Sequence, residues 1–100
     1  MAEFRLSKQA QADLVAIWDY LARRSLAAAD RQIDELIARF EFLAGTPVAG
    51  TLRDDLKRGL RLFSAGNYVI FFYVISSGVE IAGVIHGSRD YETMYLLGDR

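Results

Sequence analysis

The residues of this chain best suited to chemistry form one polar cluster, His86-Gly87-Ser88-Arg89-Asp90. The cluster directly follows an apolar stretch, so the sequence predicts that it lies at the end of a β-strand. An imidazole there can act as a general acid or base if its surroundings perturb it, and is otherwise a hydrogen-bonded turn residue. His86 is the only histidine and Ser88 stands in no nucleophile elbow, so neither a metal site nor a serine triad is predicted.

A second candidate is a set of basic side chains between the apolar segments: Arg53, Lys57, Arg58 and Arg61. Such a run is most often a solvated loop. If Arg61 and Arg89 lie close together on the folded sheet, they can instead bind a phosphate backbone or an acidic protein surface. Tyr91 and Tyr95 would then be placed to stack on bases. The residues alone leave both interpretations open.

Length and composition limit the possible classes of protein. The chain has 100 residues, enough for one domain over 1–100, and its 52% hydrophobic and 25% charged residues are typical of a globular protein. The net charge of −1 gives no overall attraction to nucleic acid or acidic membranes. There is no cysteine, and the N-terminal segment lacks the apolar core of a signal peptide. No apolar run reaches the roughly 18 residues of a membrane span, so we expect a cytoplasmic protein without cofactor or metal.

Two amphipathic helices are predicted before the polar cluster. Residues 3–6 alternate as in a short strand, after which Ser7 can cap a helix over residues 8–24. Ser25 can cap a second helix, which should end with Gly45 in the left-handed conformation. Apolar residues recur at helical spacing in both: Ala10, Leu14, Ile17, Trp18 and Leu21, then Ala29, Ile33, Leu36, Ile37, Phe40 and Leu43. The helices should pair as an antiparallel hairpin.

A three-strand meander is predicted over residues 60–90, after a segment with a helical turn near Leu52–Leu56. Its middle strand, Tyr68–Ile75, is uncharged on both faces. The predicted fold is α+β, a two-layer sandwich with the N-terminal strand and the antiparallel helical hairpin packed on an antiparallel β-meander. The second face of the middle strand needs cover from residues 91–100, from a second copy or from a different protein. Its large apolar area favours a partner.

Three blocks carry more specific information: FRLSKQAQADLVAIWDYLARRS, DDLKRGLRLFSAGNYVIFFYV and VIHGSRD. In this order and spacing they resemble the ParE-type toxins of the RelE/ParE superfamily, over nearly the whole chain. The resemblance makes the expected sandwich RelE/ParE-like. One departure is Lys57-Arg58, which stands where the family pattern has Arg-Pro.

The resemblance implies the toxin of a type II toxin–antitoxin module. ParE-type members inhibit DNA gyrase without being enzymes, whereas RelE-type members are ribosome-dependent, metal-independent endoribonucleases that cleave messenger RNA. The implied partner is a cognate ParD-like antitoxin, whose ribbon-helix-helix N-terminal part binds operator DNA and whose C-terminal segment wraps the toxin in a higher-order hetero-oligomer. The toxin would reach operator DNA only through the antitoxin. A degenerate member that only binds its antitoxin is a further alternative.

The resemblance also implies roles for residues. Ribonuclease members place cations at positions that are apolar here: Leu60, Leu62, Phe63 and Val69. The catalytic set left to a ribonuclease is Arg61, Arg89 and Tyr95. A shortage of cations around a scissile phosphate favours the gyrase-directed branch. The expected target-binding residues are Arg58, Arg61, His86 and Arg89. The expected antitoxin-binding residues are Trp18, Phe71 and Tyr73, with Phe71 rather than Phe72 on the sheet face away from the helices.

Overall fold

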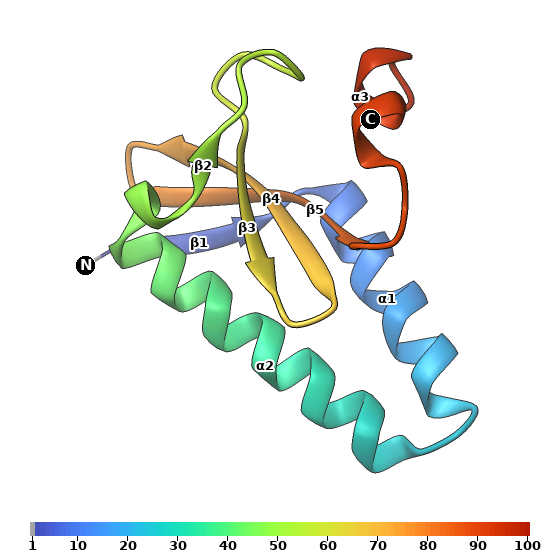
Figure 1. Cartoon of the computed structure of the whole chain (residues 1–100). Coiled ribbons are helices and arrows are strands. Elements are labelled where there is room, and N and C mark those ends of the chain that lie inside the picture. Colours follow the sequence, from blue (N-terminus) through green and yellow to red (C-terminus); the bar gives the residue numbers. More distant parts are fainter. Residues whose placement is uncertain (1) are drawn as a thin grey trace.

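Residues 2–100 are described by the computed structural model, in which two long helices and a short one pack around a single sheet (Figure 1). The helices are α1 (Lys8–Ala22), α2 (Leu26–Gly45) and α3 (Tyr91–Leu96), and a 3-10 turn, η1, spans Pro47–Ala49. The strands are β1 (Glu3–Leu6), β2 (Thr51–Leu52), β3 (Arg61–Ala65), β4 (Tyr68–Ile75) and β5 (Gly78–His86). The predicted strand, helical hairpin and meander are confirmed, and with them the α+β sandwich.

The strands lie in the order β1-β5-β4-β3-β2. β3, β4 and β5 form the antiparallel meander, and Gly66 has a positive φ of +61° in its first turn, where the sequence predicts a tight hairpin. β1 instead pairs in parallel with β5, with Glu3 opposite Gly78. A side chain at position 78 would collide with the backbone of Glu3, so glycine is what permits this approach.

The helices α1 and α2 cover one face of the sheet (Figure 1). Ser7 and Ser25 cap them as predicted, since each side-chain oxygen accepts the backbone N–H three residues on, at 3.0 and 3.1 Å. The prediction for Gly45 is wrong: it is the last helical residue and has no positive φ, because Thr46 ends the helix and leads directly into η1. The core under the helices includes Ala10, Leu36, Phe40, Leu43, Ile70, Phe72, Val79 and Ile81.

The opposite face of the sheet is covered by the chain itself. Phe71 points to this face, as predicted, and is fully buried. Its ring centroid lies 5.3 Å from that of Tyr91 and 5.1 Å from that of Tyr95, both on α3. The segment before β3 completes this second cluster with Leu56 and Leu60. The expectation that a partner covers this face is therefore wrong at Phe71, because residues 91–96 supply the cover.

The segment between α2 and β3 holds more structure than the sequence predicts. The expected turn lies at Arg53–Lys57, where the Leu56 N–H donates to the Arg53 carbonyl at 3.0 Å. The turn η1 and the edge strand β2 were not predicted. Among residues 2–100, no helix is both long and apolar enough to cross a membrane. The same residues contain no group of three His, Asp or Glu side chains suited to a metal ion.

Candidate functional site

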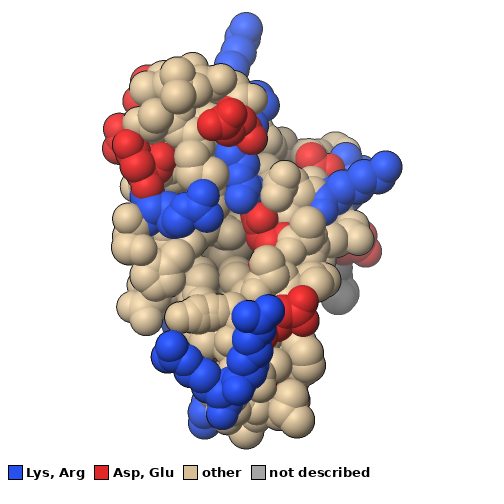
Figure 2. Space-filling view, turned by 90° about the vertical axis from the view of Figure 1, so that its right-hand side faces the viewer, with Lys and Arg blue, Asp and Glu red and all other residues tan. Residues whose placement is uncertain are grey.

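A groove lies between α1 and the paired ends of β4 and β5, on the face that Figure 2 presents. Its volume is about 700 Å³. Half of its fourteen lining residues are apolar or aromatic: Ala16, Ile17, Tyr20, Leu21, Tyr68, Val84 and Ile85. Its rim carries His86, Ser88 and Arg89. We name it the α1–β5 groove, and it brings together two of the expected target-binding residues, His86 and Arg89.

The floor of the groove is a buried ion pair between Asp13 of α1 and Arg100. The two terminal nitrogens of Arg100 donate to the carboxylate at 2.8 and 3.1 Å, and the side chains are only 10% and 11% exposed. The carboxylate also accepts the Val84 N–H and the Gln9 amide, both at 2.9 Å. A Cβ at Gly83 would lie 2.8 Å from Arg100 Nη1, so this glycine makes room for the pair. A buried charge is tolerated only when paired and hydrogen-bonded, and four donors meet that need here.

The ring of His86 is held by its own turn. Its Nδ1 accepts the Ser88 N–H at 3.1 Å and lies 2.7 Å from the Ser88 hydroxyl. Tyr68 meets the ring edge-on, with centroids 5.4 Å apart. In the neutral ring, an accepting Nδ1 leaves the proton on Nε2, which can donate at the rim of the groove. The contacts are those of a hydrogen-bonded turn residue, one of the two interpretations that the sequence allows.

Arg61 and Arg89 do not lie together. Arg61 stands opposite Phe72 on β4, so it belongs to the helical side of the sheet, where Nη1 donates to a backbone carbonyl at 2.9 Å. Arg89 comes shortly after His86, which pairs with Tyr68 on β4. Tyr68 and Phe72 are four positions, or about 13 Å, apart along β4. Arg58 is exposed in the segment before β3. Two of the four expected target-binding residues, Arg58 and Arg61, therefore lie outside the groove.

The set expected for a ribonuclease is also dispersed. Tyr95 is 7% exposed, and burial raises the pKa of its hydroxyl to about 12. Its ring packs against Phe71, on the sheet face opposite to Arg61. Arg61, the cation of β3, therefore does not lie beside Tyr95.

A smaller hollow, of about 260 Å³, lies on the sheet face that α3 covers. Its lining includes Leu62 and Val69, two positions where a ribonuclease would place cations. The cation that lines it is Arg53, which pairs with Asp55 at 2.8 Å and Glu92 at 3.6 Å. The hydrogen bond from Arg53 lowers the pKa of the Asp55 carboxyl, as expected for this pair. Within residues 2–100, the lining of this hollow has no unpaired cation.

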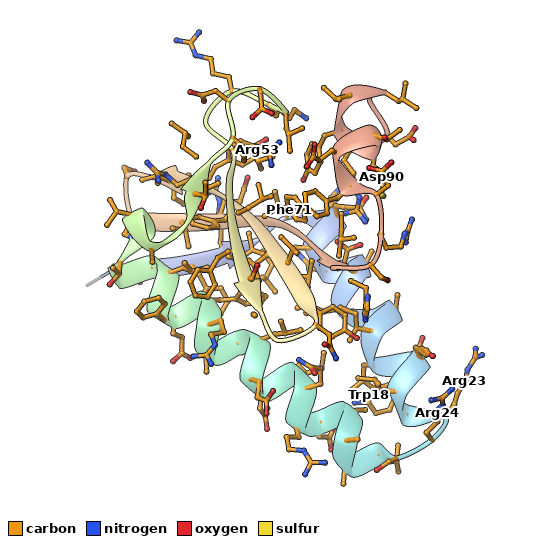
Figure 3. All side chains as sticks on the ribbon, in the orientation of Figure 1. Trp18, Arg23, Arg24, Arg53, Phe71 and Asp90 are labelled. Carbon is orange, nitrogen blue, oxygen red and sulfur yellow. The ribbon has the colours of Figure 1, made fainter. Side chains whose placement is uncertain are left out.

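The expected antitoxin-binding residues differ in exposure. Trp18 is half-buried on α1, and its Nε1 donates to Asp30 of α2 at 2.9 Å (Figure 3). Tyr73 is also half-buried, beside the second cluster, and burial raises its pKa. Both keep exposed atoms, and their contact with an antitoxin stays a prediction. Phe71 is a core residue and offers no surface to a partner while α3 is in place.

The two residues of the floor were missed in the sequence. One signal was present: Asp13 stands between Ala10 and Ile17 in the apolar stripe of α1, where a carboxylate needs a partner. Another was Gly83, because a glycine inside an apolar strand indicates the close approach of another group. No local pattern identifies Arg100 as the partner, since 87 positions separate the two residues.

The α1 end of the groove is basic as well. The Arg24 guanidinium lies over the ring of Tyr20, 5.6 Å from its centroid. Arg23 and Arg24 extend from the end of α1 (Figure 3). Figure 2 shows Lys and Arg side chains on both sides of the hollow. This local positive charge contrasts with the net charge of −1 of the whole chain.

Known proteins resemble this chain over most of its length. A family model described as "ParE toxin of type II toxin-antitoxin system, parDE" matches residues 4–91. Toxin ParE1 of Caulobacter vibrioides is 37% identical over 91 residues, covering 90% of this chain and 94% of that protein. Toxin ParE1 of Mycobacterium tuberculosis is 30% identical over 93 residues, covering 91% and 95%. Toxin RelE3 of Caulobacter vibrioides is 33% identical over 87 residues, covering 86% and 95%.

A solved structure supports the fold. A chain from the chromosomal ParDE TA system of P. aeruginosa superposes with a TM-score of 0.71 at 20% identity, covering 86% of this chain and 96% of that one. At this identity the likeness shows the RelE/ParE-like sandwich alone. The family match and the two ParE1 relatives show more: this chain belongs to the ParE toxin family of type II toxin–antitoxin systems.

Proposed function

We propose that the protein inhibits DNA gyrase when free and is neutralised by a cognate antitoxin. The observation that carries the proposal is the apolar character of the sheet face under α3. Leu62 and Val69 line the hollow on this face, and its one lining cation, Arg53, is already paired among residues 2–100. Cleavage of a phosphodiester develops negative charge that cations must stabilise, and the lining of this hollow within residues 2–100 offers no unpaired cation.

The groups left to a ribonuclease are poorly placed for catalysis. Arg61 lies on the helical side of the sheet, away from Arg89. Tyr95 has a pKa of about 12, far from the near-neutral value that suits general acid–base catalysis. The proposed activity is therefore binding rather than catalysis, and it requires no cofactor.

The proposed partner is a ParD-like antitoxin. The structurally similar chain comes from a ParDE system, and the family model names parDE. We expect the antitoxin to carry the operator-binding ribbon-helix-helix part and to assemble with the toxin as a hetero-oligomer. Trp18 and Tyr73 are its proposed contacts, because both keep exposed atoms.

The test is to incubate the purified protein with gyrase, ATP and relaxed or supercoiled plasmid, with and without its antitoxin. We expect supercoiling to stop and cleaved DNA to accumulate, and the antitoxin to reverse both effects. A parallel incubation with translating ribosomes should leave messenger RNA intact. Cut message with unaffected gyrase would instead assign the protein to the ribonucleases. Normal growth on expression without antitoxin, with neither effect, would assign it to the degenerate members.

A further inference from the structure

The α1–β5 groove has the dimensions of a docking site for a short segment of another protein. Its wall follows α1 past Ile17 and Tyr20, opposite Tyr68 of β4. Between Asp13 and Arg24, α1 and its end extend about 16 Å, or three helical turns. Its volume of about 700 Å³ lies within the range of binding clefts in proteins, roughly 300–1,000 Å³. Exposed apolar surfaces of this kind mark interaction sites.

Two cations without carboxylate partners belong to the groove or lie beside it: Arg89 lines its rim, and Arg24 covers Tyr20 of its wall. Arg89 is exposed and forms no ion pair with any residue from 2 to 100; its guanidinium contacts a methionine sulfur at 3.8 Å. Arg24 lies over the Tyr20 ring and likewise has no ion pair within that range. The single carboxylate that lines the groove, Asp13, is already neutralised by Arg100. The groove thus has a mixed apolar and polar lining, with one unpaired cation on its rim, Arg89, and another, Arg24, over Tyr20 at the end of α1.

We propose that this groove binds an acidic amphipathic segment of the target protein. Apolar side chains of the segment pack on Ile17 and Tyr20, and its carboxylates meet Arg89 and Arg24. Complementary charge selects an acidic partner and aligns it along α1. The inference rests on the proposed function, in which that target is gyrase.

Two features favour a protein segment of the target over other occupants. Nucleic acid needs a row of free cations along its phosphates, whereas Arg89 is the one cation in the described lining without a carboxylate partner. The proposed antitoxin contacts, Trp18 and Tyr73, are not among the residues that line the groove, which leaves it to the target.

The test compares charge reversals inside and outside the groove. Arg89→Glu and Arg24→Glu are each measured for binding to immobilised gyrase holoenzyme, with Arg39→Glu on the exposed part of α2 as the matched control. We expect each groove variant to lose affinity about tenfold or more and the control to match wild type. Wild-type binding should weaken with added salt, and Arg89→Glu should lose part of that dependence. All three side chains are exposed, and thermal unfolding verifies that the variants fold.

The same proteins are titrated with the cognate antitoxin, so that each outcome is decisive. Gyrase affinity that is unchanged in both groove variants overturns the inference and leaves the proposed function standing. A loss of affinity for the antitoxin alone also overturns it, because the groove then belongs to the antitoxin. If wild-type protein does not bind gyrase at all, the proposed function fails, and the occupant named here fails with it.

Discussion

Asp13 shows how one residue can organise a surface. Its carboxylate accepts four hydrogen bonds, from Gln9 on its own helix, from the Val84 backbone and from both terminal nitrogens of Arg100. Because α1 fixes the carboxylate, the charge cannot turn out to water. The ion pair therefore fastens the end of the described chain to α1 and closes the floor of the α1–β5 groove.

Breaking this pair from the arginine side should be costly. We expect Arg100→Gln to lower the free energy of unfolding by about 3 kcal/mol, because it leaves a buried carboxylate without its cation. Asp13→Asn should cost less, since Arg100 can then move into solvent. Urea denaturation measures both changes.

The control for this prediction is a surface ion pair. Arg5→Gln removes the partner of Glu80, but the Arg5 side chain is 68% exposed, so the change should stay below about 1 kcal/mol. An equal effect of Arg100→Gln and Arg5→Gln would show that burial adds nothing to the Asp13 pair.

At the residue scale, the sequence correctly predicted the features that depend only on neighbouring residues. The capping roles of Ser7 and Ser25 follow from side-chain oxygens next to free N–H groups, and both are confirmed. Residue pairs that meet only through folding were beyond these rules. Arg61 and Arg89 were expected together, but strand register places them on different parts of the sheet. That register depends on the whole meander and not on either arginine.

The helix α3 is the element whose position the sequence left most open. An uncharged β4 requires cover on both faces, and the sequence indicated this requirement correctly. It could not decide between the chain's own tail and a partner, because six helical residues carry too weak an apolar pattern to fix their docking. In the structure, Tyr91 and Tyr95 of α3 cover Phe71, whereas Leu96 and Leu97 remain exposed.

Packing of α3 should make stability depend on pH in the alkaline range. Burial raises the Tyr95 pKa from 10.0 to about 12 in the folded chain. Between these values the unfolded chain has lost a proton that the folded chain keeps, so stability falls as pH rises from about 10 towards 12. Burial also raises the pKa of Tyr68 and of Tyr73, so both add to this loss of stability. Tyr95→Phe should therefore remove part of this loss, as measured by urea denaturation at a series of alkaline pH values.

The contrast between wild type and Tyr95→Phe is the informative quantity. Parallel stability curves for the two proteins across this range would mean that Tyr95 ionises as easily in the folded chain as in the unfolded one. The cover by α3 would then be looser than its contacts with Phe71 indicate.

At the scale of the whole molecule, the candidate site is built from segments that are far apart in sequence. The α1–β5 groove takes its wall from α1, β4 and β5 and its floor from residues 87 positions apart. No linear pattern could define it, although His86 and Arg89 on its rim were selected from the sequence. The family resemblance covered nearly the whole chain, which is why it predicted the overall fold more completely than it predicted the site.

The parallel pairing of β1 with β5 joins a strand near the start of the chain to one near its end. The importance of this pairing for the sheet can be tested by mutation. Gly78 has a φ of +149°, and a Cβ there would collide with the Glu3 backbone. We expect Gly78→Ala to break the bond from the Glu3 N–H to the Ser77 carbonyl, now 2.8 Å, and to release β1. Hydrogen exchange of the amides of residues 3–6 should then accelerate, while those of α2 stay protected.

A second glycine allows the cost of backbone strain to be separated from the cost of a steric collision. Gly66 also has a positive φ, +61°, but a Cβ there would meet nothing within 4 Å. Gly66→Ala should therefore cost only the backbone strain, about 1–2 kcal/mol, and leave β1 protected. Gly78→Ala should cost more, because it adds the loss of a parallel strand to the strain. Equal costs, with β1 protected in both variants, would mean that the sheet can shift to accommodate a side chain at position 78, and that β1 does not hold β5 in place beside the groove.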